Sequence, residues 1–196
     1  MRALTRCFLA AFILSIAGCG GSGAVSVAGN DAAAVVASPV VGRKAPDFTL
    51  STLDGEAVHL ANLSPGAPVV VVQLRGWVGY QCPLCTKQVG DLVSRAAEFA
   101  SAGARVVLVY PGAAQELNTQ AKEFVTDKGL PDGFYFVTDP GLAFVTAWGL
   151  RWNADGETAY PAAFVIDAQG IVKFAKVSGS HGGRASADEI LAALGK

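Results

Sequence analysis

The chain has 196 residues, of which 52% are hydrophobic and 16% are charged, a composition typical of one globular domain. Its formal net charge is −1 and no basic run lies beyond the N-terminal segment, so nucleic-acid binding is not expected. A disulfide-stabilised secreted domain would carry several widely spaced cysteines, whereas this chain has one close pair in its body, so its stability is expected from a packed core.

Residues 1–18 are typical of a secretory signal peptide. Arg2 and Arg6 supply positive charge, the apolar run CFLAAFILSIA follows, and small residues end it. That run is short for a bilayer, which needs about 20 apolar residues, so a retained transmembrane anchor is the less favoured alternative. We therefore expect the protein to be exported.

The end of the apolar run, Ile-Ala-Gly-Cys at residues 16–19, resembles a bacterial lipobox. Cys19 would then carry lipid and become the new N-terminus, with an ordinary cleaved signal as the alternative. Residues 19–41 are small, almost uncharged and without helical or strand period, which predicts a flexible tether. The sequence thus predicts a cell-envelope protein, held at a membrane by a lipid anchor and facing the periplasm or exterior, with its domain in residues 42–196.

The domain sequence alternates strand and helix patterns. Two short apolar runs around Asp54 and Gly55 predict a β-hairpin, and Ser186 with Glu189 has the spacing of a capping box before the last helix. Between them we expect, in order, a buried strand at 67–75, a helix at 82–102, a strand at 104–110, a helix at 115–128, a strand and turn at 134–140, a short helix at 142–148, and two strands around a turn at 167–170.

This order mixes parallel crossovers with antiparallel hairpins. Short β-α-β crossovers require a parallel pair of strands with helices packed on the sheet. The sequence therefore predicts an α/β, thioredoxin-like fold: a central mixed β-sheet flanked by helices, with an N-terminal β-hairpin extension.

Cys82 and Cys85 stand at the predicted start of the first long helix. Unpaired N–H groups and the helix dipole favour the thiolate there, and the thiolate is the reactive form of cysteine. Pro83 suits the first helical turn, where its missing N–H costs nothing. Cys85 lies one turn along, so we expect Cys82 to attack and Cys85 to resolve the mixed disulfide. Arg75 and Lys87 are nearby cations that could stabilise the thiolate.

Two other interpretations of the pair stay open. Inert buried thiols are one, although free cysteines are uncommon in an oxidising compartment. A copper or zinc site is the other, and it needs more ligands than one C-x-x-C supplies. The chain has two histidines: His59 suits a half-exposed strand of the hairpin, whereas His181 lies in a glycine-rich loop. The metal alternative would therefore use Cys82, Cys85 and His181.

Three stretches, GRKAPDFTLSTLDGEAVHLANL, CPLC and YPAAFVIDAQGIVKFAKV, resemble the AhpC/TSA–redoxin branch of the thioredoxin-fold superfamily over residues 42–177. That branch includes peroxiredoxins and TlpA-like thiol–disulfide oxidoreductases. The resemblance implies a thiol-based oxidoreductase without a cofactor. Its substrates would be protein thiols and disulfides or small peroxides, and a thioredoxin-like protein would supply its electrons.

The resemblance also implies different site residues for peroxide reduction and for disulfide exchange. Peroxiredoxins pair their cysteine with a following proline, as in Cys82-Pro83, and with a threonine and an arginine aimed at the peroxide. Here Gly79 takes the threonine position and Pro161 the arginine position, although Arg75, Arg151 or Arg184 could substitute.

Pro161 instead resembles the cis-proline of thioredoxin-like proteins, with an ordinary trans-proline as the alternative. Trp77 and Tyr80 are expected beside the sulfur atoms, where they would shield the site or bind a partner, unless one belongs to the core. Together these residues favour disulfide exchange over peroxide reduction.

Overall fold

The computed structural model describes residues 37–196. The predicted signal peptide, Cys19 and most of the predicted tether lie outside these residues, so the lipid anchor stays a prediction. Among the helices of residues 37–196, none combines the length and the apolar character that crossing a bilayer requires.

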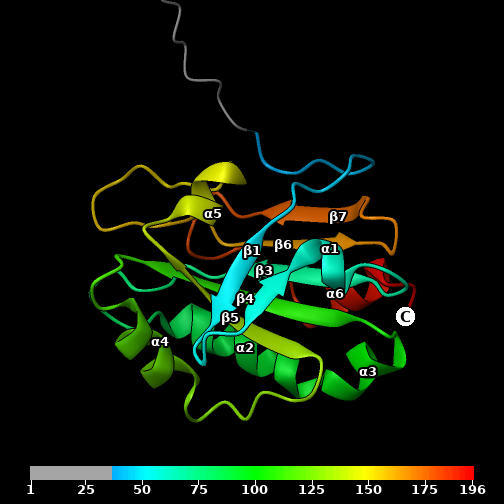
Figure 1. Cartoon of the computed structure of the whole chain (residues 1–196), viewed down its shortest axis with the longest axis horizontal. Coiled ribbons are helices and arrows are strands. Elements are labelled where there is room, and N and C mark those ends of the chain that lie inside the picture. The colour runs from blue at the N-terminus through cyan, green and yellow to red at the C-terminus, as the bar shows by residue number, and fades with distance from the viewer. Residues whose placement is uncertain (1–36) are drawn as a thin grey trace, which may run out of the picture. The chain divides into compact units, whose positions relative to one another are not determined.

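A single mixed sheet with helices on both faces forms the described domain (Figure 1). The strands are β1 (Thr49–Thr52), β2 (Ala57–His59), β3 (Val69–Gln73), β4 (Arg105–Gly112), β5 (Phe134–Pro140), β6 (Ala162–Ile166) and β7 (Val172–Val177). The helices are α1 (Leu60–Leu63), α2 (Pro83–Ser94), α3 (Ala96–Ser101), α4 (Leu117–Val125), α5 (Ala143–Ala147) and α6 (Ala187–Ala193).

The strand order in this part of the chain is β2-β1-β5-β4-β3-β6-β7. β3, β4 and β5 run parallel, and the two hairpins join them by antiparallel pairing, β1 with β5 and β6 with β3. The predicted mixed sheet is therefore confirmed, as are both hairpins and the capping box of Ser186 and Glu189 on α6.

The predicted helix over 82–102 is wrong in one respect, because it consists of two helices. The backbone leaves the helical region at Arg95, with φ −106° and ψ 17°, and α3 starts at the next residue. Val89 and Leu92 before the break and Phe99 after it all enter the same core. Apolar spacing continues across the break, so the sequence pattern could not reveal it.

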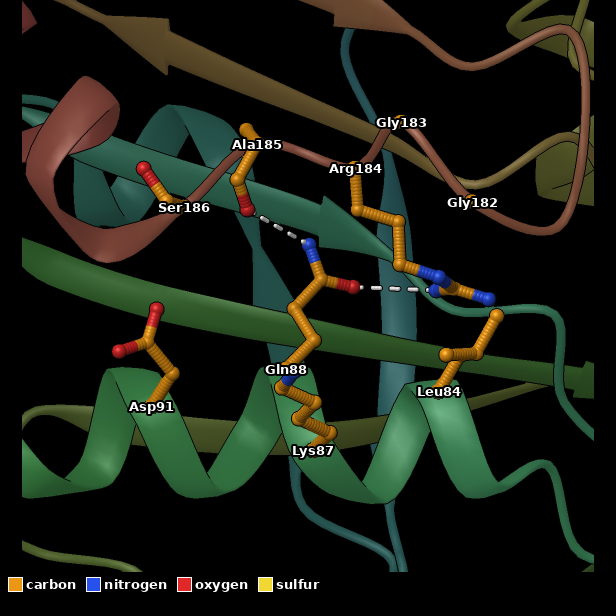
Figure 2. A pocket seen from close by; sticks show the side chains of 9 residues that line it. All are labelled: Leu84, Lys87, Gln88, Asp91, Gly182, Gly183, Arg184, Ala185 and Ser186. Carbon is orange, nitrogen blue, oxygen red and sulfur yellow. Dashed lines mark hydrogen bonds between the residues drawn. The ribbon is translucent and has the colours of Figure 1, made fainter.

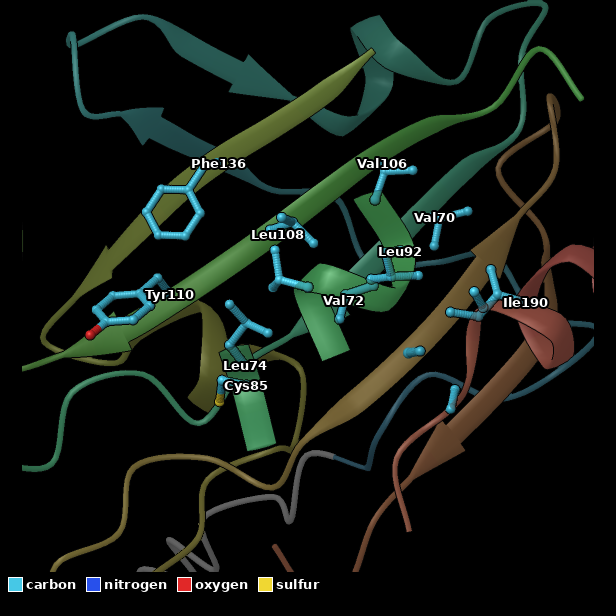
Figure 3. Packing of buried hydrophobic residues seen from close by; sticks show 14 of the residues in the cluster. Val70, Val72, Leu74, Cys85, Leu92, Val106, Leu108, Tyr110, Phe136 and Ile190 are labelled. Carbon is cyan, nitrogen blue, oxygen red and sulfur yellow. The ribbon is translucent and has the colours of Figure 1, made fainter. Parts of the chain in front are cut away.

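The sheet separates two apolar cores. Val70 and Val72 of β3 belong to the core covered by α2, α3, α4 and α6, whereas Val69 and Val71 belong to the core covered by α1 and α5. Each fully buried side chain of this kind stabilises the fold by about 1.5–3 kcal/mol. Figure 3 shows the first core, and Cys85 is one of its members. The start of α2 is thus fixed against the sheet by packing.

Candidate active site

A glycine turn carries the chain from β3 toward the two cysteines. Gly76 has φ +72°, and a Cβ atom there would lie 1.9 Å from the carbonyl oxygen of Pro111. Only glycine tolerates both this backbone conformation and this close approach. The next amide, of Trp77, donates to the same Pro111 oxygen at 3.0 Å, so the loop is tied to the end of β4.

The loop ends at Cys82, which is the N-cap residue of α2, and Pro83 is the first helical residue. Both thiols are free; Cys82 exposes 5% of its surface and Cys85 none. The side chain of Gln81 accepts from the Tyr110 hydroxyl at 2.8 Å and donates to the Gln120 carbonyl at 2.9 Å. These bonds fix the residue immediately before Cys82, which holds the thiol in place at the helix start.

The two thiols have opposite pKa shifts. A hydrogen bond from the Cys85 thiol, amide N–H groups of Cys85 and Leu84, and the nearby charge of Arg184 outweigh burial and lower the pKa of Cys82 to about 5. Its hydrogen bond to Cys82 and its burial raise the pKa of Cys85 well above the usual range for a thiol. At neutral pH the pair therefore carries one thiolate, on Cys82, and one proton, on Cys85.

Arg184 is the cation that reaches the thiolate. Its Nη2 donates to Cys82 Sγ at 3.6 Å, its Nη1 to Gln88 Oε1 at 3.0 Å, and its Nε to the His181 carbonyl at 3.0 Å. Gln88 in turn donates to the Ala185 carbonyl at 3.2 Å (Figure 2). Arg184, Gln88 and Ala185 line a cavity of about 410 Å³ between α2 and residues 182–186. Of the three arginines proposed from the sequence, Arg184 therefore contacts the thiol.

The sequence analysis did not identify Gln88, although a signal was present. Positions 85, 88, 89 and 92 form the buried stripe of α2, and Gln88 is its one polar member. A buried polar side chain needs a partner, which Arg184 and Ala185 supply.

The expected role of the Arg75 side chain is corrected. Its guanidinium, only 4% exposed, donates to both carboxylate oxygens of Glu157 at 2.6 and 3.0 Å, to the Tyr80 hydroxyl at 2.6 Å and to the Gly156 carbonyl at 3.0 Å. The Arg75 guanidinium is thus hydrogen-bonded to these four acceptors and does not bond the Cys82 thiolate. The backbone N–H of Arg75 does serve the site, because it donates to Cys85 Sγ at 3.4 Å.

The remaining predicted residues have different surroundings, and none of their side chains bonds a cysteine sulfur in the part of the chain described. Tyr80 is half exposed and its ring lies beside the Arg75 guanidinium, whereas Trp77 is partly buried and packs on the core. Arg151 donates to backbone carbonyls of its own loop, which gives it a structural role. Lys87 is exposed on the rim of the cavity.

Pro161 is buried and directly precedes β6. The antiparallel register pairs Ala162 with Gln73, so Pro161 lies opposite Leu74, one residue before the amide that donates to Cys85. The structure thus brings Pro161 to the same end of the sheet as the cysteine pair. Its cis conformation stays a prediction.

The proposed metal ligands Cys82, Cys85 and His181 do not come together. His181 instead bonds Glu157 Oε1 at 2.7 Å. The other histidine, His59, bonds Asp47 Oδ2 at 2.6 Å on the first hairpin. Within residues 37–196, no group of three or more His, Cys, Asp or Glu side chains is placed to hold a metal ion.

Comparison with known proteins identifies the family. The redoxin family profile matches residues 40–191, so this chain belongs to the redoxin family, and the AhpC/TSA resemblance is confirmed. A putative peroxiredoxin of Mycobacterium tuberculosis is 33% identical over 140 residues, covering 69% of this chain and 83% of that relative. Chloroplastic peroxiredoxin Q of Oryza sativa subsp. japonica is 32% identical over 133 residues, covering 68% of this chain and 57% of its own length. This chain thus spans little more than half of the rice protein.

Solved structures agree on the fold. The crystal structure of peroxidoxin BcpB from Mycobacterium tuberculosis superimposes with a TM-score of 0.64 at 23% identity, covering 80% of this chain and 96% of that one. The thioredoxin-like fold is therefore confirmed. The chain is therefore a redoxin-family protein whose thiols at Cys82 and Cys85 are both free.

The pKa of Cys82 predicts how the reduced protein depends on pH. Alkylation of Cys82 by iodoacetamide should rise with a midpoint near pH 5 and stay constant above about pH 6.5, because only the thiolate reacts. Unfolded protein should instead follow the ordinary thiol pKa of about 8.5. This depressed pKa stabilises the folded state fully above pH 8.5, and the stabilisation falls as the pH drops toward 5. A folded protein whose Cys82 alkylates with a midpoint near 8.5 would contradict the site described above.

Proposed function

We propose that this chain is a thiol–disulfide oxidoreductase that works through Cys82 and Cys85. The observation that carries the proposal is the pairing of a low-pKa thiol at a helix start with a buried, protonated thiol one turn later. The first is a ready nucleophile, and the second is within reach to close a disulfide with it.

In the first step the Cys82 thiolate attacks one sulfur of a substrate disulfide. A bond forms between Cys82 Sγ and that sulfur, the substrate S–S bond breaks, and the other substrate sulfur leaves as a thiolate. The negative charge has then left Cys82 for the leaving group. Cys85 therefore no longer donates its hydrogen bond to a thiolate, which removes the largest cause of its raised pKa.

In the second step Cys85 loses its proton to solvent and attacks Cys82 Sγ. The backbone N–H of Arg75, 3.4 Å from Cys85 Sγ, stabilises the thiolate that forms. The Cys82–Cys85 bond forms and the second substrate thiolate leaves. The substrate gains two electrons and this chain becomes the disulfide, which a thioredoxin-like donor would reduce again.

The substrate must reach a thiol with 5% exposure. Tyr80 and Leu84 flank Cys82 and are 50% and 40% exposed, which leaves apolar surface beside the sulfur for a protein substrate. Pro161 lies at the same end of the sheet as the cysteine pair, where it would contact the backbone of a protein substrate. Its position therefore also supports disulfide exchange.

A second candidate is peroxide reduction, and Arg184 is the observation that favours it. A guanidinium 3.6 Å from Cys82 Sγ could hold a peroxide oxygen against the thiolate. The thiolate would attack that oxygen, the O–O bond would break, and an alcohol or water would leave after protonation. Cys85 would then attack the sulfenic acid, release water and form the Cys82–Cys85 disulfide.

Two assays on the full chain separate the candidates. We expect wild-type protein to catalyse insulin reduction by dithiothreitol, and its disulfide to be more oxidising than the roughly −270 mV of thioredoxin, because the low pKa of Cys82 stabilises the dithiol. We expect hydrogen peroxide to oxidise Cys82 no faster than a small thiol with the same thiolate fraction. Rapid oxidation by peroxide with no insulin reduction would overturn disulfide exchange and establish the second candidate.

The N-terminal sequence supports an extension of this proposal to location. We infer from the signal-like residues 1–18 and the lipobox-like residues 16–19 that the enzyme works in the cell envelope, held at a membrane by lipid attached to Cys19. Stable anchoring would require several acyl chains or further membrane contacts. Mass spectrometry of the mature N-terminus in expressing cells tests this, and an unmodified Cys19 would refute it.

A further inference from the structure

The 178–184 loop brings Arg184 to Cys82, yet the loop has little packing of its own. Gly179, Gly182 and Gly183 are exposed, and Gly183 has φ +65°. No large apolar side chain occurs between Ser178 and Arg184. The loop is therefore positioned by a few polar contacts rather than by the core. Together with Gln88 of α2, which accepts from Arg184 Nη1, those contacts determine where the Arg184 guanidinium lies.

The contact between His181 and Glu157 is linked to the Cys82 thiol through Arg184. His181 Nε2 and Glu157 Oε1 are 2.7 Å apart, and the imidazole lies 5.0 Å from the ring of Trp152. The backbone carbonyl of the same histidine accepts from Arg184 Nε at 3.0 Å. Arg184 Nη2 then reaches Cys82 Sγ at 3.6 Å. The side chain of His181 thus fixes the carbonyl that orients the cation.

Glu157 is a firm attachment point for the histidine. Its side chain is 10% exposed, and both of its carboxylate oxygens accept hydrogen bonds from the buried Arg75 guanidinium. Trp152 is held as well, because it stacks on Tyr160 with ring centroids 4.7 Å apart. His181 therefore connects the glycine-rich 178–184 loop to side chains that are themselves held by ion pairing and ring stacking.

We propose that His181 is a positioning residue, which holds the 178–184 loop on Glu157 so that Arg184 faces the Cys82 sulfur. The proposal rests on the role of Cys82 as the attacking thiol. It assigns to His181 no contact with substrate and no proton transfer. Its consequence is that the reactivity of Cys82 depends on a side chain that touches neither cysteine.

Removing the imidazole should leave Arg184 with Gln88 as its fixed partner and a loop carbonyl that is no longer held, without disturbing the core, since His181 itself is exposed. The thiolate then loses a favourable charge, although the bonds from Cys85 and the helix N–H groups remain. In His181→Ala we expect the Cys82 alkylation midpoint to rise by about one pH unit, so that the rate at pH 5 falls about fivefold, while the rate at pH 8 is unchanged. His181→Gln keeps a donor for Glu157 and should restore most of the rate.

The experiment is alkylation of the reduced full chain by iodoacetamide between pH 4 and 8, with Cys82 quantified by mass spectrometry in the tryptic peptide of residues 76–87. Fragment ions separate Cys82 from Cys85. The double variant His181→Ala/Arg184→Ala is compared with Arg184→Ala alone. If His181 acts through Arg184, the double variant behaves as Arg184→Ala does, because the two substitutions remove one interaction.

His59→Ala is the matched control. His59 likewise pairs with a carboxylate, Asp47 at 2.6 Å, but on the first hairpin, and we expect it to leave the profile unchanged. Circular dichroism verifies that each variant is folded. An unchanged midpoint in folded His181→Ala, or effects of His181→Ala and Arg184→Ala that add, would overturn the proposal. Because the readout uses no substrate, it can succeed or fail independently of the insulin and peroxide assays.

Discussion

The Cys82→Ser variant is expected to lose disulfide-reductase activity by about three orders of magnitude or more. A serine hydroxyl stays protonated at neutral pH and its oxygen cannot form the mixed disulfide. Every favourable contact at this position, from the Cys85 thiol, the α2 amides and Arg184, is useful only to a thiolate. The measurement is the initial rate of insulin reduction by the full chain.

Cys85→Ala provides the complementary variant. It leaves Cys82 able to attack but removes the resolving thiol, so a mixed disulfide with the substrate should accumulate and appear as an added mass that dithiothreitol removes. Alanine is preferred to serine because this position is fully buried and a hydroxyl there would need a partner. Full activity in Cys82→Ser, or a Cys85→Ala protein that turns over without trapping substrate, would contradict the assignment of attacking and resolving thiols.

Local sequence signals were sufficient for most of the fold. The valine run of β3 is fully buried because it lies in the middle of the sheet, between β4 and β6, and its β-branched residues predict that position. The Ser186–Glu189 capping box depends on residues three apart and forms as expected. The break at Arg95 was missed because both helical segments keep the same apolar spacing.

The site was less accessible from the sequence because its partners are distant along the chain. The sequence identifies Cys82 and Cys85 as chemically capable, since their spacing and helix-start position are local properties. It offers Arg184, 102 residues later, as one of three candidate arginines but does not indicate which of them would reach Cys82. Nor does it indicate that Glu157, 82 residues after Arg75, would engage the Arg75 guanidinium. Charge and residue type were visible for all of these residues, but which cation meets which anion is decided by the tertiary fold.

The Glu157→Ala variant is expected to lower the free energy of unfolding by about 3 kcal/mol. The Arg75 guanidinium is 4% exposed and would lose the carboxylate that accepts two of its hydrogen bonds, which leaves a buried charge without its counterion. With a typical urea dependence of about 2 kcal/mol per molar, the unfolding midpoint should fall by about 1.5 M. Fluorescence-monitored urea unfolding of the reduced protein measures it.

Two further variants show whether the loss comes from the isolated charge. Arg75→Met/Glu157→Ala removes both members of the pair and should be more stable than Glu157→Ala, because an apolar side chain of similar length needs no counterion. Glu98→Ala breaks an exposed ion pair with Arg95 and should unfold at nearly the wild-type urea concentration. A Glu157→Ala protein as stable as wild type would mean that water solvates Arg75 freely. In that case Glu157 would no longer be the rigid attachment on which the position of His181, and through it the charge facing Cys82, depends.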